Sequence, residues 1–178
     1  MKILTGVPAE RLNDIPSLAQ AAEHNGFSGL STQENRHNPF LPLAIAAVHS
    51  QQLELRTNVA IAFARSPMVA AGLAWDLQYA TAGRFVLGLG SQVKGHNQRR
   101  FSVPWSPPAP RLREYIEAIQ AIWVCWRDGT PLQYEGKHYQ FSLMTPNFTP
   151  EPLTSALPKL HIAAVGPAMM KVAASACD

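Results

Sequence analysis

The stretch LELRTNVAIAF, residues 53–63, decides between two folds. As a β-strand it places alternate side chains on opposite faces. One face carries Leu55, Thr57, Val59, Ile61 and Phe63, and the other carries Arg56, Asn58, Ala60 and Ala62. An open sheet covered by helices on both sides would be apolar on both faces. A barrel interior tolerates a small and polar face better, so the stretch favours a (β/α)8 barrel over an open doubly wound sheet.

Four further strand-like runs surround this stretch, and a helix-like pattern follows each strand. The runs are KILTG (2–6), FSGLST (27–32), RFVLGLG (84–90) and KLHIAAV (159–165). Apolar residues recur at helical spacing over 12–25, 40–50, 67–82, 112–126 and 168–176. This alternation predicts a parallel sheet with right-handed crossovers. Residues 91–107 are expected to form a loop, 136–143 an extended excursion and 146–158 a proline-rich loop.

The length of the chain predicts an α/β fold that is only part of a barrel. A complete TIM barrel usually needs about 250 residues, whereas this chain has 178 residues and about five β/α units of the eight. We therefore predict that residues 1–178 form a single domain, the N-terminal portion of a longer, truncated barrel. Its first and last strands would be open edges, which favour pairing with another chain.

Composition and motif spacing argue against several classes of protein. The net charge is +3 and Arg99–Arg100 is the only adjacent basic pair, so no nucleic-acid patch is predicted. The first residues, MKILTGVP, are too short an apolar run for a signal peptide, and no segment is long enough to span a membrane, which predicts a cytoplasmic protein. Cys125 and Cys177 fit no disulfide or metal framework, and the histidines lack metal-ligand spacing. No metal site is therefore predicted.

The loops after the strands hold the candidate functional residues, because the active site of a barrel lies at the carboxyl ends of its strands. These loops carry Glu34, His37, Arg65, Ser91, Gln92, His96 and the turn at Gly166. Paired carboxylates and a G-x-S-x-G nucleophile motif are missing. Small and neutral polar residues dominate, which is typical of a site whose cofactor supplies the chemistry. Arg65 is expected to pair with a neighbouring carboxylate or to hold an anionic ligand, and Gly166–Pro167 opens a helix whose N–H groups suit a phosphate.

The run RFVLGLGSQV, residues 84–93, contains part of a dinucleotide-binding fingerprint. Gly88 and Gly90 fit the pattern G-x-G-x-x-G, but Val93 occupies the place of the third glycine. In a barrel strand the alternate large residues would face the helices and the two glycines would face the interior. We therefore expect Gly88 and Gly90 to leave room for a bound ring rather than to wrap a pyrophosphate.

Five segments, in order along the chain, form a recognisable set: TQENRHNPFLPLAIAA (32–47), NVAIAFARSP (58–67), GRFVLGLGSQVKGHNQRRF (83–101), REYIEAIQAIWVCW (113–126) and HIAAVGP (161–167). Together they resemble the luciferase-like monooxygenase superfamily, and within it the coenzyme F420-dependent oxidoreductases. The resemblance implies a (β/α)8 barrel, commonly dimeric, that binds FMN or the deazaflavin F420.

The same resemblance implies roles for residues by their position. It matches Ala60, Ile61, Ala62, Phe63 and Ala64 to a segment that carries a bulge or a non-proline cis peptide behind the cofactor ring. It matches the segment 90–96, with Gly90, Ser91, Gln92 and His96, to the part that lines cofactor and substrate. It matches Gly166, Pro167, Ala168 and Met169 to a phosphate-binding turn. Glu34 and His37 match polar positions that face the substrate, where they would supply or take a proton.

Three functions follow as alternatives. The first is an oxidoreductase that uses F420 to transfer hydride to or from a small organic substrate. The second is an FMN-dependent luciferase-like monooxygenase. The third is a truncated, non-catalytic half-barrel that self-associates. In the first two, the partners are a small-molecule substrate and a second copy of the chain.

Overall fold

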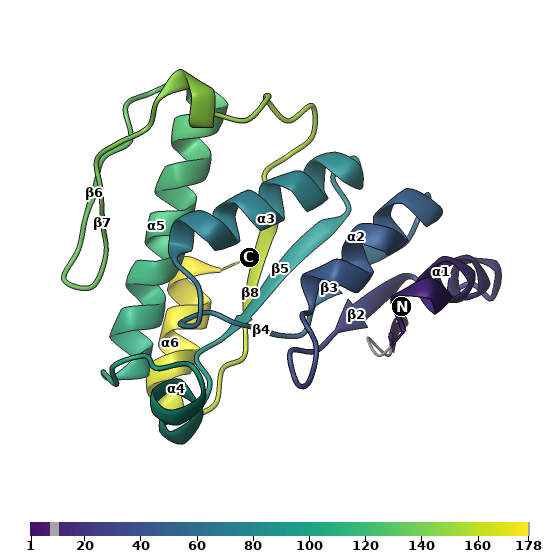
Figure 1. The fold of residues 1–178 in the computed structure, drawn as a ribbon, viewed down its shortest axis with the longest axis horizontal. Coiled ribbons are helices and arrows are strands. Elements are labelled where there is room, and N and C mark those ends of the chain that lie inside the picture. The colour runs from purple at the N-terminus through teal and green to yellow at the C-terminus, as the bar shows by residue number, and fades with distance from the viewer. Residues whose placement is uncertain (8–10, 178) are drawn as a thin grey trace.

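The computed structural model describes residues 1–7 and 11–177, and its main feature is a parallel sheet whose strands follow chain order (Figure 1). The sheet runs through β1 (Leu4–Gly6), β2 (Gly29–Thr32), β3 (Glu54–Thr57), β5 (Phe85–Gly90) and β8 (Lys159–Ile162), and β4 (Ala60–Ile61) continues the line of β3 beside β5. A doubly wound sheet reverses its strand order at a switch point. This sheet has no such reversal among the described residues, so it forms an arc of a barrel, as predicted.

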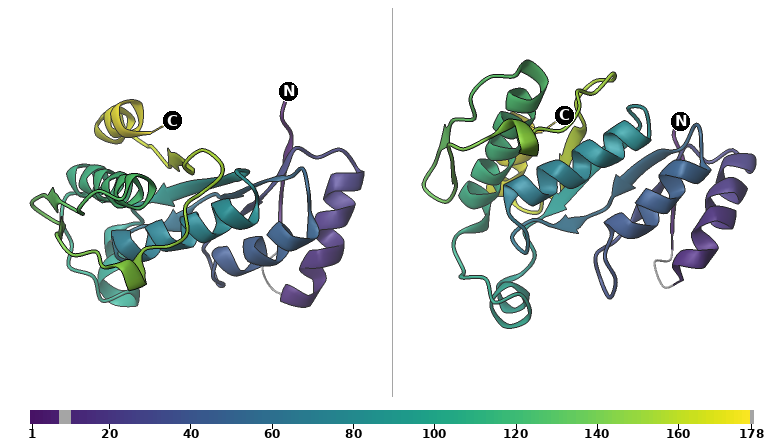
Figure 2. Two further views of the ribbon diagram at one scale, coloured as in Figure 1. Left: turned by 90° about the horizontal axis from the view of Figure 1, so that it is seen from above. Right: turned by 45° about the horizontal axis from the view of Figure 1, so that its top comes forward.

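The helices form a layer on the outside of this arc. They are α1 (Ile15–His24), α2 (Phe40–His49), α3 (Pro67–Ala80), α5 (Pro108–Asp128) and α6 (Pro167–Ala176), with the short 3-10 helix η1 (Leu12–Asp14) before α1. Each helix packs against the next one along the chain, and Figure 2 shows them following one another around the sheet. The apolar stripe predicted for residues 112–126 is buried on α5. None of the helices that the structure describes is both long and apolar enough to cross a membrane.

The predicted strand 53–63 is interrupted by a bulge between β3 and β4. Arg56 lies opposite Val86 and Ala60 lies opposite Leu89, so the bulged side has one more residue than β5. The peptide bond between Asn58 and Val59, within this bulge, is cis. The expected bulge or cis peptide is therefore present, but it lies just before residues 60–64 rather than within them.

The bulge reverses the faces predicted for the end of this stretch. One extra residue exchanges the two faces of a strand. Ala60 and Ala62 therefore belong to the core under the helices, whereas Val59 and Ile61 face the opposite side. The alternation predicted from the sequence is correct for Leu55 and wrong for these four residues.

Residues 91–107 are not wholly a loop, because Lys94–Arg100 form the helix α4. Asn97 is its one buried residue, so the segment has no apolar stripe that could have revealed a helix. The extended excursion is a small hairpin of β6 (Tyr134–Glu135) and β7 (Gln140–Phe141), and the proline-rich loop begins with the 3-10 helix η2 (Pro146–Phe148).

Candidate functional site

A pocket of about 470 Å³ lies at the carboxyl ends of the strands, which is where a barrel places its active site. Its wall comes from the segments that follow β2, from the bulge and β4, from the segments after β5 and β8, and from the first turns of α5 and α6. The lining residues are Gln33, Glu34, Asn35, Asn58, Val59, Ile61, Gly90, Ser91, Gln92, Val93, Pro108, Ala163, Val165 and Met169. The volume lies within the range of small-molecule and cofactor sites.

Glu34 reaches from the end of β2 to a buried ion pair with Arg65. Arg65 donates from Nη1 to Glu34 Oε2 and from Nη2 to Glu34 Oε1, both at 2.7 Å. The backbone N–H of Ile61 also donates to Oε2, at 2.7 Å. The Glu34 side chain is 9% exposed and that of Arg65 is 15% exposed. Both carboxylate oxygens are therefore occupied, which favours a positioning role for Glu34 over the proton transfer suggested by the sequence.

Arg65 connects this pair to the helix layer. Its guanidinium lies over the ring of Phe40, with Cζ 5.3 Å from the ring centroid, and Nη1 also donates to the carbonyl of Ile61 at 3.2 Å. Of the two roles left open for Arg65, the structure shows the pairing with a carboxylate. Arg65 itself does not line the pocket.

Behind this pair, the hydroxyl of Tyr115 on α5 donates to the carbonyl of Ser66 at 3.3 Å. Burial, with the nearby Tyr139, raises the pKa of Tyr115 far above its usual range, so the phenol stays neutral. Neither the neutral phenol nor the closed ion pair therefore presents an unpaired charge to the pocket.

His37 stands in the exposed part of the loop after β2 and does not line the pocket. Its neighbour Asn35 does, and the backbone carbonyl of Asn35 accepts a hydrogen bond from Arg100 Nη2 at 2.7 Å. Contact between His37 and a bound substrate stays a prediction. His96, which the sequence placed with the lining residues, is exposed on α4 and outside the pocket wall.

The turn after β5 is held in place by Asn97. Gln92 adopts a left-handed backbone with φ of 57°, and Ser91, Gln92 and Val93 all line the pocket. Asn97, which is 1% exposed, donates from Nδ2 to the carbonyl of Ser91 at 2.9 Å and from its backbone N–H to the carbonyl of Val93 at 3.1 Å. The helix α4 thus serves to fix the shape of this part of the wall.

The two glycines of β5 have different surroundings. A Cβ on Gly88 would collide with the carbonyl oxygen of Thr57, and Gly88 does not line the pocket. The Thr57 side chain also contacts the backbone of Gly88. Its hydroxyl accepts a hydrogen bond from Gly88 N at 2.9 Å and donates one to Gly88 O at 2.7 Å. The expectation that Gly88 leaves room for a ring is therefore wrong, because the backbone of the bulge already fills that space. Gly90 does line the pocket.

The other residues predicted for the site also fall into two groups, those that line the pocket and those that do not. Ile61 lines the pocket, whereas Ala60, Ala62 and Phe63 belong to the helix-side core, and Ala64 lies outside the lining. At the start of α6, Gly166 has a left-handed φ of 85° and Pro167 begins the helix. Met169 lines the pocket, but Gly166, Pro167 and Ala168 do not.

Sequence reasoning missed seven of the lining residues: Gln33, Asn35, Asn58, Val59, Pro108, Ala163 and Val165, whereas Val93 falls within the predicted segment 90–96. Most of them lie beside a strand end, so the carboxyl-end rule could have included Gln33, Asn35 and Val165. Asn58 and Val59 enter the site through the bulge, which the residue pattern does not reveal and which only the family resemblance suggested.

The lining as a whole is neutral and has two kinds of surface. Carboxamide side chains come from Gln33, Asn35, Asn58 and Gln92. Apolar side chains come from Val59, Ile61, Ala163, Val165 and Met169. No group of three or more histidine, cysteine, aspartate or glutamate side chains that could hold a metal occurs in the described part of the chain. Such a pocket can pack against a flat apolar ring and hydrogen-bond its polar edge.

Comparison with known proteins identifies the family to which this sequence is similar. A family model described as luciferase-like monooxygenase matches residues 2–178. An uncharacterised protein of Mycobacterium tuberculosis is 49% identical over 175 residues, which cover 98% of this chain and 52% of that protein. A second protein of the same organism, provisionally named a coenzyme F420-dependent oxidoreductase, is 31% identical over 175 residues, which cover 90% of this chain and 48% of that protein.

Solved structures with the same fold include enzymes of two kinds. The coenzyme F420-dependent tetrahydromethanopterin reductase of Methanopyrus kandleri superposes with a TM-score of 0.77 at 23% identity, over 99% of this chain and 54% of that chain. An oxygenating component of 3,6-diketocamphane monooxygenase from Pseudomonas putida, in complex with FMN, superposes with a TM-score of 0.73 at 16% identity, over 91% of this chain and 51% of that chain. The chain thus spans about half the length of the proteins that it matches.

Proposed function

Because the chain belongs to the luciferase-like monooxygenase family, we propose that it forms the cofactor-binding part of a cytoplasmic F420-dependent oxidoreductase. When bound, F420 would accept hydride from, or donate it to, a small organic substrate. The name of the relative at 31% identity supports F420 over FMN. Residues 1–178 would then be the N-terminal part of a barrel, and the activity would belong to the complete barrel.

The observation that carries this proposal is the neutral lining of the pocket at the bulge. A deazaflavin has a flat apolar ring system with carbonyl and N–H groups along one edge. Val59 and Ile61, which the bulge turns toward the pocket, offer apolar surface for the ring. Asn58 and Gln92 carry carboxamides that can both donate to and accept from its polar edge. The residues present therefore fit such a ring.

The start of α6 would hold the phosphate of the cofactor. The helix has ten residues, and its first backbone N–H groups have no partner within the helix, which suits an anion. Met169 from this first turn reaches the pocket wall, so the turn at 166–169 is close to the ring site. Glu34 and Arg65 would position the bulge behind the ring. His37 remains the candidate for proton transfer.

A flavin monooxygenase is the second candidate. The FMN-bound neighbour from Pseudomonas putida has the same fold, and FMN also combines a flat ring with a phosphate. The same lining would therefore serve either cofactor.

A third candidate is a half-barrel that self-associates without catalysis. Among the described strands, β1 and β8 each pair along one edge only, and a free edge favours pairing with another chain. On the outer face of α2, Leu41 and Val48 are 53% and 71% exposed, and they are seven residues apart, so they lie on one side of the helix. This surface supports a homo-oligomer in all three candidates.

Titration of the chain with F420 and, separately, with FMN tests these candidates, with cofactor absorbance and fluorescence as the readout. Binding of F420 alone supports the first candidate, and binding of FMN alone supports the second. A folded chain that binds neither supports the third. Gln92→Ala should weaken binding about tenfold, the value of one lost hydrogen bond of roughly 1.4 kcal/mol. Gln98→Ala, on the exposed side of α4, is the matched control and should bind as the unaltered chain does.

A further inference from the structure

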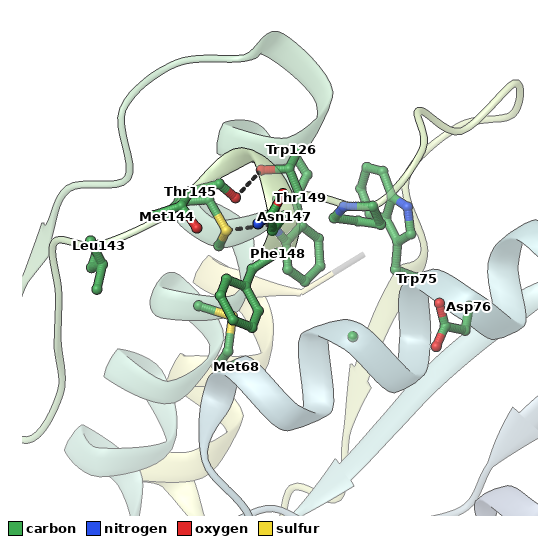
Figure 3. A pocket seen from close by; sticks show the side chains of 12 residues that line it. Met68, Trp75, Asp76, Trp126, Leu143, Met144, Thr145, Asn147, Phe148 and Thr149 are labelled. Carbon is green, nitrogen blue, oxygen red and sulfur yellow. Dashed lines mark hydrogen bonds between the residues drawn. The ribbon is translucent and has the colours of Figure 1, made fainter.

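A second pocket, of about 520 Å³, lies outside the sheet and shares no lining residue with the candidate site. Its walls are α3, the C-terminal part of α5 and the segment 143–150 (Figure 3). The lining residues are Met68, Gly72, Trp75, Asp76, Trp126, Leu143, Met144, Thr145, Asn147, Phe148, Thr149 and Pro150. We call it the Trp75–Trp126 pocket.

The two indole rings give this pocket a rigid aromatic wall. Trp75 and Trp126 meet edge to face, with centroids 5.3 Å apart and an interplanar angle of 76°. Trp75 Nε1 donates to the carbonyl of Glu151 at 3.0 Å, and Trp126 Nε1 donates to Met144 Sδ at 3.4 Å. Both indole N–H groups therefore have partners. Trp75 is 2% exposed and Trp126 is 6% exposed, so the two rings form the buried back wall of the pocket and present little of their faces to a ligand.

The mouth of the pocket exposes large apolar side chains. Leu143 is 76% exposed and Phe148 is 77% exposed. Both come from the same short segment, and Figure 3 shows Phe148 next to Met68 at the opening. Apolar surface gathered around a concave opening indicates a place where another molecule binds.

The segment that forms this mouth has open space on two sides. A separate cavity of about 560 Å³ is lined by Met144, Thr145 and Thr149, which also line the Trp75–Trp126 pocket, and by residues at the end of α5. The segment therefore borders a cavity on each side and is held to α5 by the hydrogen bond from Trp126 to Met144.

Asp76 supplies the one charge of the Trp75–Trp126 pocket. It lies on α3 at the edge of the pocket, beside Trp75 (Figure 3). It takes part in none of the ion pairs found among the described residues. Partial burial raises the pKa of the Asp76 carboxyl, as expected for a carboxylate without a cationic partner. The other polar lining side chains, Thr145, Asn147 and Thr149, are uncharged.

We propose that the Trp75–Trp126 pocket binds a small organic cation, an ammonium group carried on an aromatic or branched aliphatic body. The body packs against the indole rings and the methionine side chains, and the ammonium pairs with Asp76. The indole rings are too deeply buried for a cation–π contact, so the preference for a cation rests on Asp76. An anion would be repelled by the Asp76 carboxylate. This proposal is independent of the cofactor site.

A matched pair of probes tests the proposal on the 178-residue chain. 4-Phenylbutylamine carries the cation, and 4-phenylbutan-1-ol is its neutral counterpart with the same body. Binding is followed by calorimetry and by the fluorescence of the four tryptophans. The amine should bind about fivefold more tightly than the alcohol, as expected for one ion pair with an exposed carboxylate.

Two variants locate the binding. Asp76→Asn keeps the shape of an exposed side chain. It should lower the affinity for the amine to the affinity for the alcohol. Glu135→Gln removes an exposed carboxylate that lies outside the pocket and should leave the preference for the amine unchanged. Circular dichroism confirms that each variant is folded. Equal affinities for amine and alcohol, an unaltered preference in Asp76→Asn, or no binding at millimolar concentration would each overturn the proposal.

Discussion

Arg65 holds both carboxylate oxygens of Glu34, at 2.7 Å each, across the end of the bulged strand. The same carboxylate accepts the backbone N–H of Ile61, whose side chain lines the candidate site. The ion pair therefore fixes the strand segment that forms the pocket wall. It joins the loop after β2 to the loop after β4, so it also fixes the relation between two β/α units.

Glu34→Gln should destabilise the chain by about 3 kcal/mol, because it leaves the buried guanidinium of Arg65 without its counter-charge. The free energy of unfolding in urea measures this effect. Asp128→Asn is the control, since it breaks the exposed pair of Asp128 with Arg127 and should change stability little. Equal stability of Glu34→Gln and the unaltered chain would show that the pair does not organise the bulge.

Gly88→Ala should destabilise the fold by about 3 kcal/mol, since the new Cβ would meet the backbone carbonyl of Thr57 and the strand must shift. Gly72→Ala, inside α3, is the opposite case, because nothing lies within 4 Å of its added Cβ. It should stabilise the helix by about 0.5–1 kcal/mol. Thermal unfolding of the two variants compares them directly, and a loss of cofactor binding in Gly88→Ala without loss of stability would contradict the packing argument.

Asn97→Ala should weaken cofactor binding about tenfold, because it removes the two hydrogen bonds that Asn97 Nδ2 donates to the turn, to the carbonyl of Ser91 at 2.9 Å and to that of Val93 at 3.4 Å. The loss of the buried carboxamide should also cost about 1 kcal/mol of stability. Fluorescence titration with F420, at a temperature where the variant is folded, separates the two effects. Gln98→Ala again serves as the control, and unchanged affinity in Asn97→Ala would mean that α4 does not shape the site.

The sequence predicts the order of the elements well, because each strand and most helices carry their own apolar pattern. The burial of the α5 stripe and the parallel order of the strands follow from such patterns. The apolar pattern does not predict the bulge. Residues 59–63 are apolar on both faces, so one added residue does not change their pattern.

The sequence does not predict the helix α4 or the choice of Glu34 as the partner of Arg65, for different reasons. α4 is polar around its circumference and is fixed by one buried asparagine. Glu34 and Arg65 are 31 residues apart in the chain, and only the sheet register brings them together. Residues that form the wall of the site are therefore predictable near strand ends, whereas those that shape the wall from behind depend on tertiary contacts.

The inner face of the sheet carries a charge cluster whose effect on stability depends on pH. Glu54 pairs with Arg56 on the same strand and with Lys2, whose Nζ lies 3.0 Å from Oε2. Burial tends to raise the pKa of Glu54, but the hydrogen bonds from Arg56 and Lys2 outweigh it and lower this pKa below its ordinary value of 4.5. A lowered pKa in the folded state means that the unfolded chain binds the proton more readily.

The stabilisation from Glu54 is therefore complete above pH 4.5, and it is lost as the pH falls through the lower folded-state value. Glu54→Gln keeps the shape of the side chain but cannot titrate, so its stability should fall less steeply than that of the unaltered chain below pH 4.5. Urea unfolding at a series of pH values from 3 to 7 measures the two slopes. Asp14→Asn, at an exposed position on η1, should follow the unaltered chain. Parallel slopes for Glu54→Gln and the unaltered chain would show that solvent screens this cluster completely.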